Sequence, residues 1–180
     1  MTPFDWYNAR FSLDFRLELL ATNNIAASDH NGTVNGASSF IGKIKVLANG
    51  REIYSCNNAN HCVNIKNVLE YNPSFVESVA SNEYYYLDTS TSAEERTTEA
   101  DYNKGFAARK RELGASATVN CEIPLNRYSF FEALEDKLLT NTKTEISVEF
   151  DEESNIIWQA GANCRFVFLR FQFFVPRLTF

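Results

Sequence analysis

The strongest constraint on the fold of this chain lies near its amino terminus, where apolar and polar side chains alternate over residues 8–20. The apolar members of this run are Phe11, Leu13, Phe15, Leu17 and Leu19. A period of two sends successive side chains to opposite faces of an extended backbone. The run therefore predicts one long strand with one buried face and one solvated face.

Further strand signals follow along the chain. Residues 40–55 predict a hairpin, because Asn49-Gly50 favours the positive φ angles of a type I′ turn. Alternation also predicts strands at residues 119–123 and 146–150. Residues 165–175 are almost continuously apolar, so we expect a central strand that is covered on both faces.

Segments with helical periodicity lie between some of these strands. Apolar side chains recur three to four residues apart over residues 59–80, which predicts a helix followed by a second short one. Residues 128–139 predict another helix with one apolar face. The polar stretch from Asp88 to Gly114 is expected to be a long surface excursion, with a helical turn near Phe106, that contacts a neighbouring molecule.

Composition agrees with a β protein. The chain has 15 Phe and 8 Tyr among 180 residues, and both types favour half-buried pleated surfaces. The pattern of about seven or eight short strands with inserted helices favours a sandwich over a parallel sheet. We predict a mainly β fold, an antiparallel jelly-roll β-sandwich with short helices between strands, as a single domain over residues 1–180.

Charge limits the partners that this chain can have. The net charge is −6, and an acidic body repels phosphate, which disfavours nucleic-acid binding as the main role. The basic cluster of the sequence consists of Lys104, Arg109, Lys110 and Arg111. It would give at most weak, salt-sensitive contacts with a packaged genome. The alternative is a solvated helix face, or salt bridges to acidic residues of a neighbouring subunit.

The sequence offers little catalytic chemistry. Its two histidines are His30, in an Asn/Gly-rich turn, and His61, which opens a predicted helix beside Cys62. Neighbouring helix residues point in different directions, which argues against a Cys–His nucleophile pair. The acidic run at residues 145–153 lacks the spacing of a calcium loop. There is no phosphate-binding glycine loop. We expect no enzyme, and no catalytic, cofactor or metal site.

Cysteine usage also argues against a metal site. The four cysteines are Cys56, Cys62, Cys121 and Cys164. Their spacings match no zinc pattern, so we expect small buried hydrophobes in a reducing compartment. No leader sequence is visible, and no apolar run approaches the roughly 20 residues of a membrane span.

Five segments, in their order, carry a family resemblance. They are Trp6-Tyr7-Asn8-Ala9; Ile44 to Gly50; Asn57 to His61 before Leu69-Glu70-Tyr71; Tyr102 to Phe106 before Arg109; and Ile123 to Phe131 before Leu138-Leu139-Thr140. Their order and spacing resemble the first jelly roll of the major capsid proteins of polinton (Maverick) elements and adintovirus-like viruses. These proteins belong to the double-jelly-roll lineage, with adenovirus hexon and virophage capsids.

The resemblance implies a structural protein of the virion capsid. Two tandem jelly rolls form each family subunit, and this chain resembles the first of them. Three subunits form a pseudo-hexameric capsomer of an icosahedral shell, so the implied partners are copies of the chain, neighbouring capsomers and other capsid proteins. It also implies synthesis in the host cytoplasm, with assembly there or in the nucleus, and neither active site nor cofactor. The family has a strand before Trp6, and its absence would leave a sheet edge unpaired.

Two other functions are compatible with a β-sandwich. A carbohydrate- or ligand-binding module could use Tyr84, Tyr85 and Tyr86 for stacking if they are exposed, and residues 84–87 are a possible short strand. Alternation would then place Tyr85 on the opposite face from the other two. A cupin-type enzyme would need histidine and carboxylate ligands on neighbouring strands, but both histidines lie outside the predicted strands.

Overall fold

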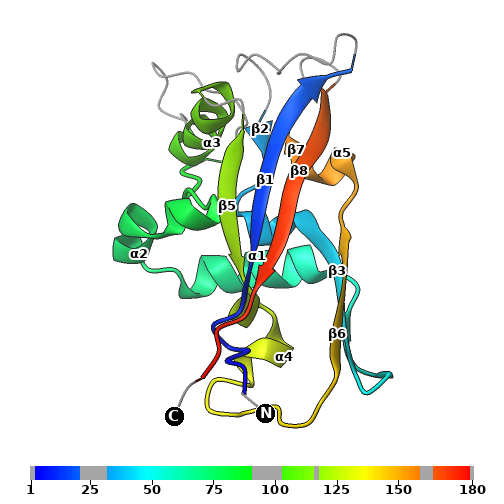
Figure 1. Ribbon diagram of the computed structural model, residues 1–180. Helices are drawn as coiled ribbons and strands as arrows, with labels where there is room; N and C mark the ends of the chain where they lie inside the picture. The colour runs from blue at the N-terminus through cyan, green and yellow to red at the C-terminus, as the bar shows by residue number, and fades with distance from the viewer. Residues whose placement is uncertain (1–2, 21–31, 91–102, 116–117, 159–163, 179–180) are drawn as a thin grey trace.

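Two antiparallel three-stranded sheets dominate the computed structural model, which describes residues 3–20, 32–90, 103–115, 118–158 and 164–178 (Figure 1). The first sheet has the order β5-β1-β8, with β1 at Arg10–Leu19, β5 at Val119–Pro124 and β8 at Cys164–Phe174. The second has the order β4-β3-β6, with β3 at Ile41–Ala48, β4 at Arg51–Cys56 and β6 at Thr144–Phe150. A two-stranded ribbon joins β2 at Gly32–Thr33 to β7 at Ile157–Trp158. The chain is mainly β, as its sequence predicts.

Strand β1 is the centre of the first sheet. It pairs antiparallel with β5 on one side and with β8 on the other, so that Leu13 lies opposite both Cys121 and Phe171. Its predicted inward side chains are buried, except Leu19, which is partly buried. The opposite face is not fully solvated as predicted, because Ser12 and Glu18 are buried as well. The register with β8 shifts between Asp14 and Phe15, a β-bulge that adds one residue to β8. The alternating sequence therefore predicted this strand and its buried face correctly.

The predicted hairpin at residues 40–55 is also confirmed. Strands β3 and β4 pair antiparallel, and their turn places Asn49 and Gly50 at φ angles of 49° and 79°. Both angles lie in the left-handed region, which Gly and Asn tolerate best. Strand β6 then pairs with the other edge of β3, from Ile41 opposite Phe150 to Ala48 opposite Thr144.

Helices lie between the strands. The α-helices are α1 at Ala59–Glu70, α2 at Pro73–Ser78, α3 at Lys104–Ala115, α4 at Ser129–Glu132 and α5 at Glu153–Ile156. The 3₁₀ turns are η1 at Ala37–Phe40, η2 at Ala80–Glu83 and η3 at Leu125–Arg127. The helix predicted over residues 59–80, with a second short one, is confirmed as α1 and α2.

Three predicted elements differ from the structure. The helix predicted at residues 128–139 is only the four-residue α4 followed by turns. Residues 84–87 form no strand, because Tyr84 adopts a left-handed conformation with a φ of 55° at the end of η2. Residues 104–115 form a full helix where the sequence predicted a surface excursion with one helical turn. In the last two cases tertiary contacts override a weak local signal.

Strand β8 is the largest correction to the predicted fold. Among the described residues it pairs with β1 alone, so it is an edge strand and not a central one. Phe166 at its start is buried, whereas Phe168, Phe171 and Phe173 are about 40 % exposed. A continuous apolar run indicates potential burial on both faces, but it does not say whether a partner strand is present.

The core is built around Phe15. The ring of Phe15 stacks on Phe166 at a centroid distance of 4.7 Å and meets the rings of Phe40 and Tyr84 edge-on at 5.3 Å each. These side chains come from β1, β8, η1 and the end of η2, and all are buried. Edge-on and stacked aromatic pairs stabilise beyond the area that they bury, by about 0.5–1.5 kcal/mol each.

Helix α3 packs so closely that Gly105 is required. A Cβ atom added at Gly105 would lie 2.5 Å from the carbonyl oxygens of both Tyr86 and Leu87. We expect Gly105→Ala to destabilise the fold by about 1–3 kcal/mol, because backbone must move. Helix propensity alone would predict a gain of about 1 kcal/mol. Gly114→Ala, at an exposed position of the same helix, is the control and should be neutral or stabilising in urea denaturation.

Glu18 makes stability depend on acid pH. Hydrogen bonds from Arg165 (Nη2–Oε2 2.6 Å) and from Arg16 (Nε–Oε1 2.7 Å) hold the pKa of Glu18 below its usual 4.5. A lowered folded-state pKa stabilises the protein above pH 4.5, and this contribution is lost as the pH falls below it. We therefore expect Glu18→Gln to lower the urea midpoint at pH 7 and to approach wild type near pH 3. Glu135→Gln, at an exposed glutamate, should differ little from wild type at pH 7.

Candidate functional site

The predicted basic cluster is not a surface patch. Arg109 is fully buried, and its guanidinium donates hydrogen bonds to the carbonyl oxygens of Thr33 (2.9 Å) and Tyr86 (3.1 Å). It also pairs with the Asp88 carboxylate at 3.0 Å. Arg109 therefore ties β2 and residues 86–88 to α3.

The other members of the cluster differ in exposure. Lys110 is buried with 9 % exposure, whereas Lys104 and Arg111 are exposed. The expectation that all four could touch nucleic acid is wrong for Arg109, because its charge is used inside the protein. Within the described part of the cluster, Lys104 and Arg111 are the members whose charges remain exposed to solvent.

The predicted contact region, Asp88 to Gly114, is only partly described. Residues 91–102 lie outside the described residues, as does His30. In the described part, Asn103 and Phe106 are buried, so α3 packs into the fold there. This helix leaves Lys104 and Arg111 exposed but presents no projecting arm.

The three tyrosines do not form a stacking platform. Tyr84 and Tyr85 are both buried, with 1 % and 2 % exposure. The Tyr84 hydroxyl donates to the Arg109 carbonyl oxygen at 3.1 Å, and burial raises the pKa of Tyr84. Tyr85 meets the ring of Tyr71 edge-on at 4.9 Å. These rings hold the fold together and are not available to sugars.

The candidate polar residues are dispersed. His61 is exposed on α1. Glu149 faces Lys43 at 3.9 Å, and Asp151 accepts a hydrogen bond from Asn60 at 2.5 Å. Within the described ranges, no three His, Cys, Asp or Glu side chains come together to hold a metal ion. The acidic run is thus divided among separate local contacts.

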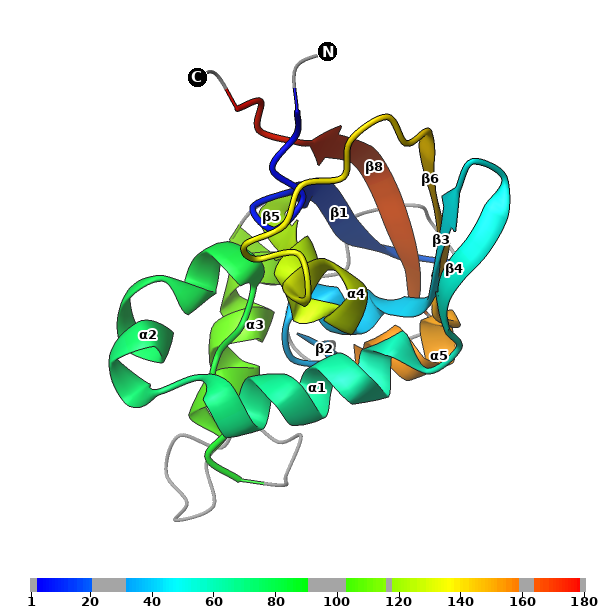
Figure 2. The same ribbon diagram turned by 90° about the horizontal axis from the view of Figure 1, so that it is seen from below.

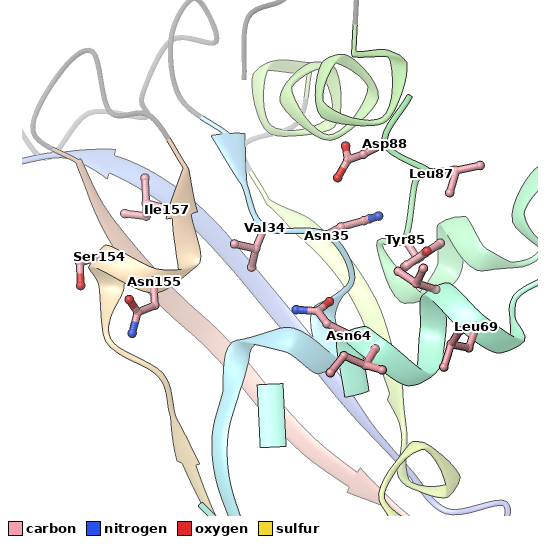
Figure 3. A pocket seen from close by; sticks show the side chains of 12 residues that line it. Val34, Asn35, Asn64, Leu69, Tyr85, Leu87, Asp88, Ser154, Asn155 and Ile157 are labelled. Carbon is pink, nitrogen blue, oxygen red and sulfur yellow. The ribbon is translucent and has the colours of Figure 1, made fainter. Parts of the chain in front are cut away.

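The surface of the described residues instead presents several apolar hollows, and the first is a groove beside α1 (Figure 3). We call it the α1 groove. It has a volume of about 680 Å³ and is lined by Val34, Asn35, Asn64, Ile65, Val68, Leu69, Tyr85, Leu87, Asp88, Ser154, Asn155 and Ile157. Figure 3 shows Leu69 on one wall, with Tyr85 and Leu87 on another and Ile157 opposite them.

The apolar stripe of α1 faces outward along this groove. Ile65, Val68 and Leu69 are 63 %, 69 % and 79 % exposed. The buried residues of the helix are instead Ala59, Val63 and Asn67. The sequence spacing predicted the helix, but it did not reveal that its larger apolar residues would face solvent. An exposed apolar stripe of this kind is typical of an interaction surface.

Several polar side chains of the α1 groove already have partners within the fold. Asn35 Oδ1 accepts a hydrogen bond from the Tyr86 backbone at 2.8 Å, and Asn64 Oδ1 accepts one from the Ser39 hydroxyl at 2.6 Å. Asp88 is engaged in its ion pair with the buried arginine. These groups add no convergent set of free polar atoms, so the groove offers chiefly apolar contact.

The second apolar feature is a cleft between the two sheets, which we call the inter-sheet cleft. It has a volume of about 360 Å³ and is lined by Trp6, Phe11, Thr144, Ile146, Val148, Phe171 and Phe173. Strands β8 and β6 border the same side of the molecule (Figure 2). At one end the sheets touch, with the rings of Phe150 and Phe168 4.1 Å apart. Towards Phe173 the cleft opens between them, and the inward side chains of β8 remain about 40 % exposed there.

Both strands that border this cleft are sheet edges. In the described part of the chain, β8 pairs only with β1, and β6 pairs only with β3. The outer edges therefore carry backbone groups that can accept another strand. The Thr144 hydroxyl, which lines the cleft, has no hydrogen-bond partner among the described residues. Phe174 is exposed on the other face of β8, where it lies opposite Arg10, and Leu169 is the exposed extra residue of the bulge.

Fold and surface define a mainly β protein, and the hollows described above are lined chiefly by apolar side chains of the described residues. No protein-family model matches the chain, and neither a curated protein nor a solved structure does. None of the helices within the described residues is long and apolar enough to cross a membrane.

Proposed function

We propose that this chain is a structural β-sandwich domain that packs against other copies of itself in a virus-type protein shell. The observation that carries the proposal is the inter-sheet cleft, where the inner face of β8 is left uncovered. An inner sheet face with two free strand edges is completed by another chain more readily than by a small molecule.

The energetics favour such packing. Fully burying a phenylalanine contributes about 1.5–3 kcal/mol. Covering the exposed part of a side chain that is about 40 % exposed would therefore contribute roughly a further 1 kcal/mol. Three phenylalanines on the inner face of β8 are in this state, namely Phe168, Phe171 and Phe173. Covering all of them would contribute about 3 kcal/mol, or about two orders of magnitude in association. Shell assembly depends on interface area of this kind.

The finer part of the proposal is a jelly roll of the double-jelly-roll capsid lineage. Two facing antiparallel sheets with inserted helices support it, as does the resemblance to polinton and adintovirus-like capsid proteins. The partners would be two further copies in a trimeric capsomer, neighbouring capsomers and other capsid proteins. The proposal implies a place in the virion capsid.

Light scattering on a sizing column, followed by negative-stain imaging of the same fractions, tests this proposal. We expect trimers or larger assemblies for the wild type at micromolar concentration. The double variant Phe171→Ser, Phe173→Ser should weaken association at least tenfold, because it makes the cleft polar. The matched control is Leu69→Ser in the α1 groove, which should leave cleft-mediated assembly unchanged.

Two results would contradict the proposal. One is a folded monomer at every concentration up to about 100 μM, a range in which a specific interface should associate. The other is an oligomer that the Leu69→Ser variant disrupts and the double variant leaves intact. The second result would show that the chains associate through the α1 groove and not through the inter-sheet cleft.

The volume of the α1 groove favours a second candidate function, a ligand-binding β-sandwich module. At about 680 Å³ the groove lies within the size range of small-molecule sites, and most of its wall is apolar. An anilinonaphthalene fluorescent probe should then bind the wild type, and Val68→Asp should reduce binding at least fivefold. Ile53→Asp, at an exposed apolar position of β4, is the control. A glycan screen would separate sugar ligands from apolar ones.

A further inference from the structure

Two cysteines that are six positions apart in the sequence meet on the surface. Cys56 ends β4, and Cys62 lies in the first turn of α1. Their sulfur atoms are 3.9 Å apart, and both thiols are free. Cys62 is exposed and Cys56 partly so. This corrects the expectation that all four cysteines are buried hydrophobes.

The other two cysteines do not compete for this pairing. Cys121 and Cys164 are buried. They lie on opposite sides of β1, with Cys121 opposite Leu13 and Cys164 opposite Leu19. A disulfide needs Cα atoms within about 7 Å, so these two cannot join without rearranging the sheet.

We propose that Cys56 and Cys62 form a reversible intramolecular disulfide, a modification site that locks the junction between β4 and α1. The oxidant class is a low-molecular-weight disulfide such as oxidised glutathione. This inference does not depend on the proposed assembly, since it concerns contacts within one chain.

The reaction is a double thiol–disulfide exchange. The exposed Cys62 thiolate attacks one sulfur of the oxidised glutathione, whose S–S bond breaks and releases one glutathione thiolate. The Cys56 thiolate then attacks Cys62 Sγ in the mixed disulfide, forming the Cys56–Cys62 bond and releasing the second glutathione. Two protein thiols are oxidised, one disulfide is reduced, and the two protons end on the released glutathiones.

The surroundings set the speed of this exchange. Burial and the neighbouring Cys56 thiol raise the pKa of Cys62 above its ordinary value of 9.0. Thiolate is the attacking species, so oxidation should accelerate roughly tenfold per pH unit between pH 7 and 9. The site is thus suited to slow equilibration with its redox environment, not to rapid peroxide sensing.

The disulfide would close the loop of residues 56–62. Cross-linking a loop of this length restricts the unfolded chain. We expect the melting temperature to rise by about 5 °C for a domain of this size.

Peptide mapping provides the decisive measurement. No lysine or arginine lies between Glu52 and Lys66, so trypsin releases both cysteines in one peptide, residues 52–66. The full chain is incubated with glutathione buffers of rising oxidised fraction, and then digested without reduction. We expect this peptide to lose about 2 Da, since two hydrogen atoms leave, and the loss to be reversed by reduced glutathione.

The control variant is Cys62→Ser, a small change at an exposed position. It leaves Cys56 as the single cysteine of the peptide, so oxidation should stop at a mixed disulfide with glutathione on Cys56, and the melting temperature should not rise. The inference is overturned if the wild-type peptide keeps both thiols free, or carries glutathione on each, at the most oxidising ratio. An equal melting-temperature rise in Cys62→Ser would also overturn it.

Discussion

Arg109→Met is expected to destabilise the fold by about 3–5 kcal/mol in urea denaturation at pH 7. Methionine keeps most of the side-chain length but removes every hydrogen-bond donor. The carbonyl oxygens of Thr33 and Tyr86 then lose their donor, and each unpaired buried acceptor costs about 1–3 kcal/mol. Asp88 loses its cation as well, although its side chain is 30 % exposed and keeps access to water.

The neighbouring cation supplies a matched control. Arg111→Met removes the same charge from the same helix at an exposed position and should change stability by less than about 0.5 kcal/mol. Equal stability losses in the two variants would contradict an internal role for Arg109. A salt-dependent affinity for DNA that both variants reduce alike would restore the idea of a basic surface.

The strands were predictable where periodicity is local and strong. β1, the β3–β4 hairpin, β5 and β6 each carry alternating side chains or a turn with positive φ, and the structure has all of them. Strand β8 was predicted with the wrong neighbours, because apolar sequence does not reveal whether another strand covers it. Helix α3 lacks a clear apolar period, and it is fixed by the close approach of Gly105 to residues 86 and 87.

The candidate surfaces were less predictable than the strands. The basic cluster around Arg109 is expected at the surface from its sequence, because charged residues are rarely buried. Arg109 can be buried because Thr33, Tyr86 and Asp88 satisfy its guanidinium. These partners lie far from Arg109 in the sequence, so no local sequence pattern predicts the contacts. The spacing of Ile65, Val68 and Leu69 predicts a helix whether this stripe faces the core or the solvent. The structure shows that it faces the solvent.

Phe15→Ala is expected to cost about 3–5 kcal/mol, the range for truncating a buried aromatic side chain. Phe15 is fully buried, and its ring contacts Phe40, Tyr84 and Phe166 from three other segments. Truncation leaves a cavity that these rings cannot fill without leaving their rotamers. The loss should appear as a lower urea midpoint with little change in slope. Phe15→Leu, which fills part of the space, should cost less and provides a folded variant if alanine is not tolerated.

The matched control is Phe174→Ala, in the neighbouring strand of the same sheet. Phe174 is 45 % exposed, so its truncation should cost only about 1–1.5 kcal/mol in the isolated chain. If the chain assembles through β8, the same substitution should weaken association while the unfolding of the dissociated chain stays near wild type. A large loss of stability in the monomer would show instead that the end of β8 belongs to the core, and this end of the strand would then not be free for assembly.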